Sequence, residues 1–242
     1  MASAPTSGST RAVVSPSGDS ALRVEAGTDD REVAWRLVHH LARRLDRARL
    51  PGVVCTIPTY DALLVELDPV EVSSSQLVPA LMGLVDDLDL DEPVSASPRE
   101  FEVPVLYDDD GSLDLADVAR AQGITPEELV ALHSAPRYVV RCLGAPGGSP
   151  MLDGPPLPHP VPRLKSPRAH VPQGVVSLAG RQATITPAAA PGGWCLIGRT
   201  PLTVLDLSAE PLVPYAPGDV VVFRPIDRAE YEALRGTRMA AR

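Results

Sequence analysis

Aromatic residues, lysines and cysteines are all scarce in this chain of 242 residues. Phe, Trp and Tyr together make up 4% of the chain, and Lys165 is the only lysine among its 22 basic residues. The cysteines Cys55, Cys142 and Cys195 are far apart and form no CxxC motif. The sequence therefore predicts neither a disulfide framework nor a zinc site, and we expect no metal centre in the chain.

Long apolar runs and a positive net charge are also lacking. No segment approaches the roughly 20 apolar residues that cross a bilayer, and residues 1–20 lack a basic region leading into an apolar one. These absences predict a cytoplasmic protein, and the Ser/Gly/Pro-rich start predicts a flexible tail over residues 1–13. The formal net charge of -9 and the few aromatic side chains argue against a nucleic-acid partner.

Proline is abundant, with 27 residues, and this argues against long helical bundles. An α+β pattern is present instead. Leu22, Val24 and Ala26 alternate with polar residues and predict a strand. Helical spacing then predicts a helix capped by Thr28, with His39 and His40 on its solvent-facing side.

Strands are next expected at 52–57 and 60–67, and a helix after the capping serines that begin at Ser73. The order strand, helix, strand, strand, helix is typical of a ferredoxin-like domain, which we assign to residues 14–90. An acidic stretch with Pro and Ser but no periodicity follows, and residues 91–100 are predicted to be a linker.

A second domain is predicted over residues 101–234. Gly123 ends a helix over 114–121, and Thr125 caps the next helix, with Pro126 at its first position. Short apolar runs between glycines and prolines then predict a β-barrel or sandwich, closed by a helix over 227–234 and a frayed tail over 235–242. The six runs are Tyr138–Leu143, Val175–Ala179, Gln182–Thr186, Trp194–Ile197, Leu202–Leu207 and Val220–Phe223.

The chemistry-bearing stretch is Gly154–Leu205, which contains no Asp or Glu although the chain is acidic overall. Its basic residues are Arg163, Lys165, Arg168, Arg181 and Arg199, together with His159 and His170. Guanidinium groups offer paired donors to carboxylate or phosphate oxygens, so the stretch indicates an anion site. The alternative is that these arginines cover a barrel surface and pair with acids elsewhere in the chain.

Nine prolines between 146 and 172 should hold Arg163 and Arg168 on a stiff scaffold, although a rigid surface loop has the same composition. Gly193–Thr200 fits the spacing of a phosphate-binding loop, but its interior is bulky and Pro201 follows, so a strand is expected there. His133 and His170 are isolated imidazoles, for which both a structural and a catalytic role stay open.

Several segments together bear a resemblance that extends from about Val14 to Ile226. They are Gly18-Asp19-Ser20-Ala21-Leu22, Pro58-Thr59-Tyr60, Pro126-Glu127-Glu128, Pro162-Arg163, Ser166-Pro167-Arg168, Val171-Pro172, Ala179-Gly180-Arg181-Gln182, Pro191-Gly192-Gly193-Trp194, the run from Leu196 to Pro201, and Pro217-Gly218-Asp219. In this order and spacing the chain resembles the family that includes allophanate hydrolase subunit 1, the B component of 5-oxoprolinase and the Kip-type kinase inhibitor, known as the carboxyltransferase domain with subdomains C and D.

The resemblance implies a ferredoxin-like domain followed by a cyclophilin-like β-barrel. It also implies a subunit of an ATP-dependent 5-oxoprolinase, which opens the lactam of 5-oxoproline. The expected partners are a barrel protein similar to the C component of 5-oxoprolinase and a protein similar to its A component. ATP would bind here or on a partner. The residues expected to bind substrate or phosphate are Arg163, Arg168, Gln182, Gly192, Gly193, Trp194, Arg199 and Thr200, with His133 and His170 as further candidates.

The chain also departs from the family pattern. Where the family has a Gly-Phe-x-Pro-Gly-Phe loop, this chain has Gly144-Ala145-Pro146-Gly147-Gly148-Ser149, and Ala183, Thr184 and Thr186 replace a threonine, a glycine and a tyrosine. Lost ring contacts weaken a small-ligand site, so the substrate can differ or the chain can be non-catalytic. The alternative hypothesis is therefore a regulatory binding protein of the histidine-kinase-inhibitor type.

Overall fold

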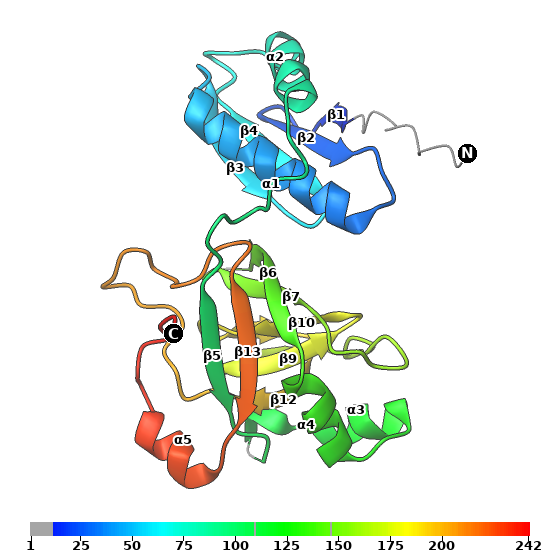
Figure 1. Cartoon of the computed structure of the whole chain (residues 1–242), viewed down its shortest axis with the longest axis vertical. Coiled ribbons are helices and arrows are strands. Elements are labelled where there is room, and N and C mark those ends of the chain that lie inside the picture. Colours follow the sequence, from blue (N-terminus) through cyan, green and yellow to red (C-terminus); the bar gives the residue numbers. More distant parts are fainter. Residues whose placement is uncertain (1–11, 109, 146) are drawn as a thin grey trace, which may run out of the picture. The chain divides into compact units, whose positions relative to one another are not determined.

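A computed structural model of the chain describes residues 12–108, 110–145 and 147–242 (Figure 1). It divides into two compact units, Met1–Ala96 and Ser97–Arg242, and this division falls inside the predicted linker 91–100. Of the predicted tail 1–13, residues 1–11 lie outside the described residues, whereas Ala12 and Val13 begin a strand. No helix within the described ranges is long and apolar enough to cross a membrane.

The first unit is a four-stranded antiparallel sheet in the order β1-β2-β4-β3, packed against two helices. Its elements are β1 (Ala12–Pro16), β2 (Ala21–Ala26), α1 (Arg31–Ala48), β3 (Val53–Pro58), β4 (Ala62–Leu67) and α2 (Ser74–Asp86). Alternate residues such as Leu22 and Val24 of β2 and Leu63 and Val65 of β4 are buried with Leu41 of α1. The predicted order of elements is present from β2 to α2, and β1, which the sequence did not predict, adds an edge strand through a hairpin with β2.

Two expectations for α1 are wrong. Asp30, rather than Thr28, caps the helix, because its Oδ1 accepts the amides of Glu32 and Val33 while Thr28 instead accepts the amide of Asp30. His39 and His40 are buried rather than solvent-facing. Segments distant in sequence cover them, since His39 Nε2 lies 3.1 Å from the Thr59 carbonyl and His40 Nε2 lies 3.0 Å from the Glu92 carbonyl.

The second unit is built on a seven-stranded sheet in the order β12-β9-β10-β7-β6-β13-β5. The strands are β5 (Glu100–Val105), β6 (Arg137–Gly144), β7 (Ser149–Asp153), β9 (Val175–Ala179), β10 (Gln182–Ile185), β12 (Cys195–Arg199) and β13 (Val220–Pro225). The edge strands β5 and β12 meet where Leu106 and Arg199 exchange two backbone hydrogen bonds of 2.9 and 2.8 Å. This contact nearly closes the sheet into a barrel.

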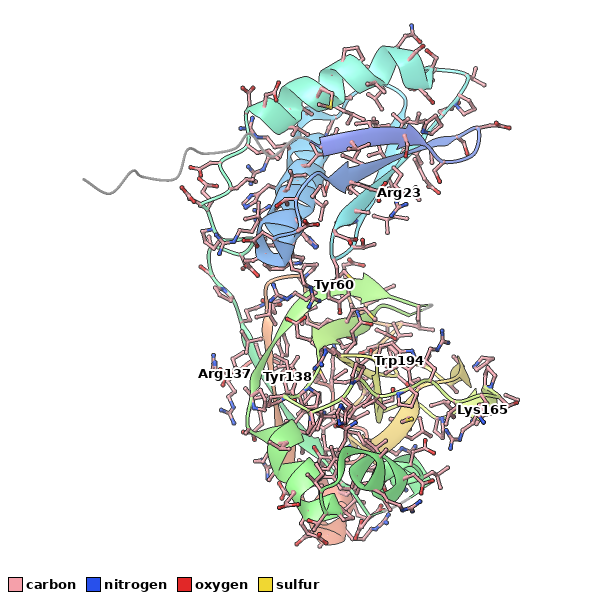
Figure 2. The ribbon with its side chains drawn as sticks, turned by 90° about the vertical axis from the view of Figure 1, so that its right-hand side faces the viewer. Arg23, Tyr60, Arg137, Tyr138, Lys165 and Trp194 are labelled. Carbon is pink, nitrogen blue, oxygen red and sulfur yellow. The ribbon has the colours of Figure 1, made fainter. Side chains whose placement is uncertain are left out.

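The second unit also contains a 3-10 turn and helices, which lie toward one end of the sheet (Figure 1): η1 (Asp110–Ser112), α3 (Leu115–Gln122), α4 (Pro126–Ser134) and α5 (Arg228–Leu234). The caps are as predicted, because Gly123 ends α3 in the left-handed region and Thr125 forms a capping box with Glu128. Strand alternation is visible in β6, where Arg137 points outward and Tyr138 is buried (Figure 2). The core contains Phe101, Val140, Leu178, Ile197 and Phe223.

Two further expectations for this unit are wrong. Leu202–Leu207 is not a strand; Thr203 makes only an isolated bridge to Arg238. The tail 235–242 is not frayed, because that bridge holds it, Met239 is 1% exposed, and the Arg242 amide donates to the Glu100 carbonyl. Strands β5 and β7 were missed, since Pro104 and Pro150 interrupt their apolar pattern.

Candidate functional site

A small two-stranded ribbon organises the acid-free stretch. Strands β8 (Arg168–Val171) and β11 (Ala190–Gly192) pair antiparallel, with Val171 opposite Ala190 and Arg168 opposite Gly192. Val171 is buried with Val175 and Leu196 in a separate apolar cluster, which fixes one end of the ribbon to β9 and β12. The sequence did not predict this ribbon, because each strand is only a few residues long and lies among prolines and glycines.

Arg163 lies beside the ribbon, against Gly193. Its Nη2 is 3.5 Å from the position that a Cβ would occupy on Gly193, and the Leu164 amide donates to the Gly193 carbonyl at 2.8 Å. Arg163 is exposed and has no hydrogen bond or ion pair with any described residue. Nearby, Lys165 projects from the end of its loop and Trp194, closer to the strands, is half-buried (Figure 2).

Arg168 already has a carboxylate partner. Its Nη1 and Nη2 donate to Asp114 Oδ2 and Oδ1 at 2.9 and 2.7 Å, and these hydrogen bonds raise the pKa of the Arg168 guanidinium. The Leu196 amide donates to the same carboxylate at 2.7 Å. Sequence reasoning missed Asp114, because this residue is 54 positions before Arg168 and no local pattern links the two.

Arg199 is the last residue of β12 and Thr200 follows it, so both lie at the opposite end of this strand from Gly193. Arg199 Nε donates to the Gln173 carbonyl at 3.2 Å, and the Thr200 amide donates to the Gly174 carbonyl at 2.9 Å. Gly174 has a φ of +79° and a Cβ there would stand 2.5 Å from the Thr200 oxygen, so only glycine fits. These two residues are built into the barrel seam next to Leu106.

Gln182 occupies a different place, in β10 between Ala179 and Asp153. It lines a hollow with His159, Val161 and Gly180 whose volume of about 10 Å³ holds about one water molecule. This hollow is too small for a substrate. Gln182 therefore lines no cavity of substrate size there.

The segment that mimics a phosphate-binding loop is strand β12, as expected. Cys195–Arg199 pairs with β9, and a Cβ on Gly198 would stand 2.6 Å from Val105 Cγ1. Gly198 is thus required by close packing between β12 and β5. Because the segment is an extended strand, it lacks the loop and the following helix that define a phosphate-binding loop.

The two candidate histidines differ completely. His170 is exposed on β8, whereas His133 is fully buried, stacked on Phe223 at 4.4 Å between ring centroids. His133 Nδ1 lies 2.7 Å from the Tyr107 hydroxyl, and its Nε2 has no partner within the described structure. Burial lowers the pKa of His133 to about 3, which favours the neutral form of the imidazole.

A larger hollow, of about 800 Å³, lies in the first unit between α1 and the segment after α2. Arg43, Arg44 and Arg47 line it together with Asp89 and Glu92. Arg43 and Arg44 donate to the carbonyls of Val94 and Asp87, and the hollow lies at the C-terminal, negative ends of both helices. It therefore lacks the acid-free character predicted for the anion site.

The predicted residues thus separate into four places. The ribbon of β8 and β11 contains Arg168 and Gly192, and beside it lie Arg163, Gly193 and Trp194. The other three places hold Arg199 with Thr200, then Gln182, and then His133. No described contact joins Arg163, Arg168 and Arg199. Across the described ranges, no group of three or more His, Cys, Asp and Glu side chains could hold a metal ion.

Comparison with known proteins gives a consistent result. The family model described as carboxyltransferase domain, subdomain C and D, matches residues 12–215. The B component of the 5-oxoprolinase of Bacillus subtilis is 33% identical over 226 residues, covering 90% of this chain and 94% of that protein. The crystal structure of TTHA0988 matches with a TM-score of 0.72 and 35% identity, covering 86% of this chain and 40% of that one. The urea amidolyase of Kluyveromyces lactis shares the fold, with a TM-score of 0.78 at 21% identity over 97% of this chain and 16% of that one.

Proposed function

Because the chain belongs to the family of carboxyltransferase domains with subdomains C and D, we propose that it is one subunit of an ATP-dependent amidohydrolase of the 5-oxoprolinase type. The substrate is a small cyclic amide that carries a carboxylate. The overall reaction adds one water across the lactam C–N bond and another across a phosphoanhydride bond of ATP. On this proposal the first unit is ferredoxin-like and the barrel is cyclophilin-like.

The observation that carries the proposal is the free guanidinium of Arg163. It is exposed, lies against Gly193 and contacts no carboxylate in the described structure, within a stretch that itself contains no acid. A guanidinium in this state can bind a carboxylate through two parallel hydrogen bonds. Arg168 does not add its charge to this site, since Asp114 already neutralises it.

Exposure of Arg163 also supports the need for partner proteins. An exposed ion pair contributes only about 0.2 to 1 kcal/mol, whereas millimolar binding requires about 4 kcal/mol. A partner surface that covers Arg163 would exclude water and strengthen the ion pair. We therefore propose that a barrel-type partner completes the site and that ATP is bound with or by the partners.

The proposal is tested by reconstituting the chain with its partner proteins and measuring ATP hydrolysis with and without 5-oxoproline. We expect substrate-dependent hydrolysis, and we expect Arg163→Gln to reduce kcat/KM about a hundredfold. Lys165→Gln is the matched control. Lys165 is two residues from Arg163, is also exposed and has no described partner, so this variant removes one nearby positive charge. Equal activity in the two variants would refute the role of Arg163.

The same reconstitution, combined with a kinase-binding assay, distinguishes the enzyme subunit from the alternative, a regulatory binding protein. A regulatory protein of the kinase-inhibitor type would bind its target alone, and 5-oxoproline would not change its behaviour. No hydrolysis in the fully reconstituted wild type, together with tight binding to a kinase, would support that alternative.

A further inference from the structure

Asp114 occupies a helix-capping position without capping the helix. It precedes α3, where aspartate normally accepts amides of the first turn, but its side chain makes no such bond. Instead, the carboxylate accepts both Nη donors of Arg168 and the amide of Leu196, and the Asp114 amide donates to the Leu196 carbonyl at 2.9 Å. The group is buried, with a side-chain exposure of 11%. The carboxylate therefore connects three elements: α3, β12 and the ribbon strand β8.

The ribbon needs such a connection. A two-stranded ribbon of three or four residues per strand is at most marginally stable alone. Val171 anchors one end through its apolar cluster, and Arg168, opposite Gly192, anchors the other through Asp114. The planar guanidinium and its two parallel bonds fix both the distance and the orientation of this end.

The end of the ribbon that Arg168 anchors also carries the proposed substrate-binding groups. Gly192 leads directly into Gly193, whose carbonyl accepts the Leu164 amide, and a Cβ on Gly193 would stand 3.5 Å from Arg163 Nη2. Arg163 has no hydrogen bond of its own within the described structure, so its position depends on this backbone. A shift of the ribbon would move Arg163 and Gly193 together.

We propose that Asp114 is a positioning residue of the substrate site: through Arg168 it holds the ribbon so that Arg163 and Gly193 face the substrate carboxylate in one fixed geometry. This inference rests on the proposed function, which gives Arg163 its substrate. It assigns Arg168 an indirect role, as the link between Asp114 and the ribbon.

The first test is kinetic and uses the full chain reconstituted with its partner proteins. Asp114→Asn keeps the shape of the side chain but removes its charge and one acceptor for Arg168. We expect KM for 5-oxoproline to rise about tenfold or more, with a smaller change in kcat, since misplacement of binding groups by about 1 Å has effects of this size or larger. Asp117→Asn is the matched control, because this carboxylate is on the same helix but pairs with Arg120 in an exposed contact. We expect it to leave both constants within about twofold.

A double-mutant cycle tests whether the two residues act as one unit. If Asp114 works through Arg168, the Asp114→Asn/Arg168→Gln variant will have a KM no higher than the worse of the two single variants. Multiplicative effects would overturn the proposal, because Arg168 would then contact the substrate independently. Loss of thermal stability with an unchanged KM would also overturn it and leave Asp114 with a purely structural role.

The second test does not depend on activity. Amide hydrogen exchange of the segments 162–171 and 190–196 should be about tenfold faster in Asp114→Asn than in the wild type, and unchanged in Asp117→Asn, because the ribbon opens locally when its anchor is lost. If Asp114→Asn does not fold, Arg168→Lys weakens the same ion pair from the side of the ribbon and provides the same comparison. Unchanged exchange would refute the anchoring role, whereas faster exchange in a protein inactive with 5-oxoproline would refute only the proposed function.

Discussion

His133 illustrates how a single buried side chain ties stability to pH. It was a candidate for catalysis because an isolated imidazole can transfer protons near neutral pH. The sequence could not show that Tyr107, Tyr138 and Phe223 enclose its ring, since these residues come from separate elements. The pKa of about 3 keeps the ring of the folded protein neutral at neutral pH.

We expect this group to destabilise the protein in acid. The folded-state pKa is about 3 and the unfolded value is about 6.5, so the unfolded chain binds one more proton between these values. The contribution of His133 is therefore complete above about pH 6.5 and falls by about 1.4 kcal/mol for each pH unit below it. Urea unfolding from pH 4 to 7 should show a steeper decline for the wild type than for His133→Gln. His170→Gln, at an exposed position, should retain the wild-type slope, and parallel curves for His133→Gln and the wild type would contradict the assignment.

Among the candidate binding residues, the sequence identified the residue types better than their partners. Arg163 and Arg168 have the same surroundings in sequence, yet one is free and the other is bound to Asp114. The difference arises from a carboxylate on a distant helix, which one sequence does not reveal. Composition alone indicated the acid-free stretch, because that is a local property of the chain.

At the scale of elements, local signals predicted what local interactions determine. Gly123, in the left-handed region, ends α3, and the capping box at Thr125 begins α4, both as expected. Each cap involves only residues within one turn. The ribbon strands β8 and β11 were not predicted, because their pairing depends on Asp114 and on the cluster around Val171. His39 and His40 were misplaced for the same reason, since the covering segments are distant in sequence.

The C-terminal tail, residues 235–242, was predicted to be frayed but packs against the barrel, and this packing can be tested. Met239 is almost completely buried in the barrel core, and its amide donates to the Thr203 carbonyl. Met239→Ala should lower the free energy of unfolding by about 2 to 3 kcal/mol, whereas Met239→Leu should cost less than about 1.5 kcal/mol. Chemical denaturation measures both. If Met239→Ala unfolds like the wild type, the tail does not contribute to the core.

At the scale of the whole molecule, two units with separate cores share one chain of net charge -9. The acid-free stretch is concentrated in one of them, around the ribbon of the barrel unit. The predicted class, a mixed α+β protein with a barrel-like second part, is confirmed by the nearly closed sheet. Of the three arginines expected to bind the substrate, Arg163 and Arg168 lie at the ribbon, whereas Arg199 lies at the barrel seam, because this placement depends on pairing between segments that are distant in sequence.

The most direct measurement is a crystal structure of the chain reconstituted with its partner proteins and soaked with 5-oxoproline. We predict that the substrate carboxylate lies within about 3 Å of the Arg163 guanidinium, as a charge-assisted hydrogen bond requires, with Arg168 still bound to Asp114. A carboxylate bound elsewhere while Arg163 remains in solvent would contradict the assignment of the site.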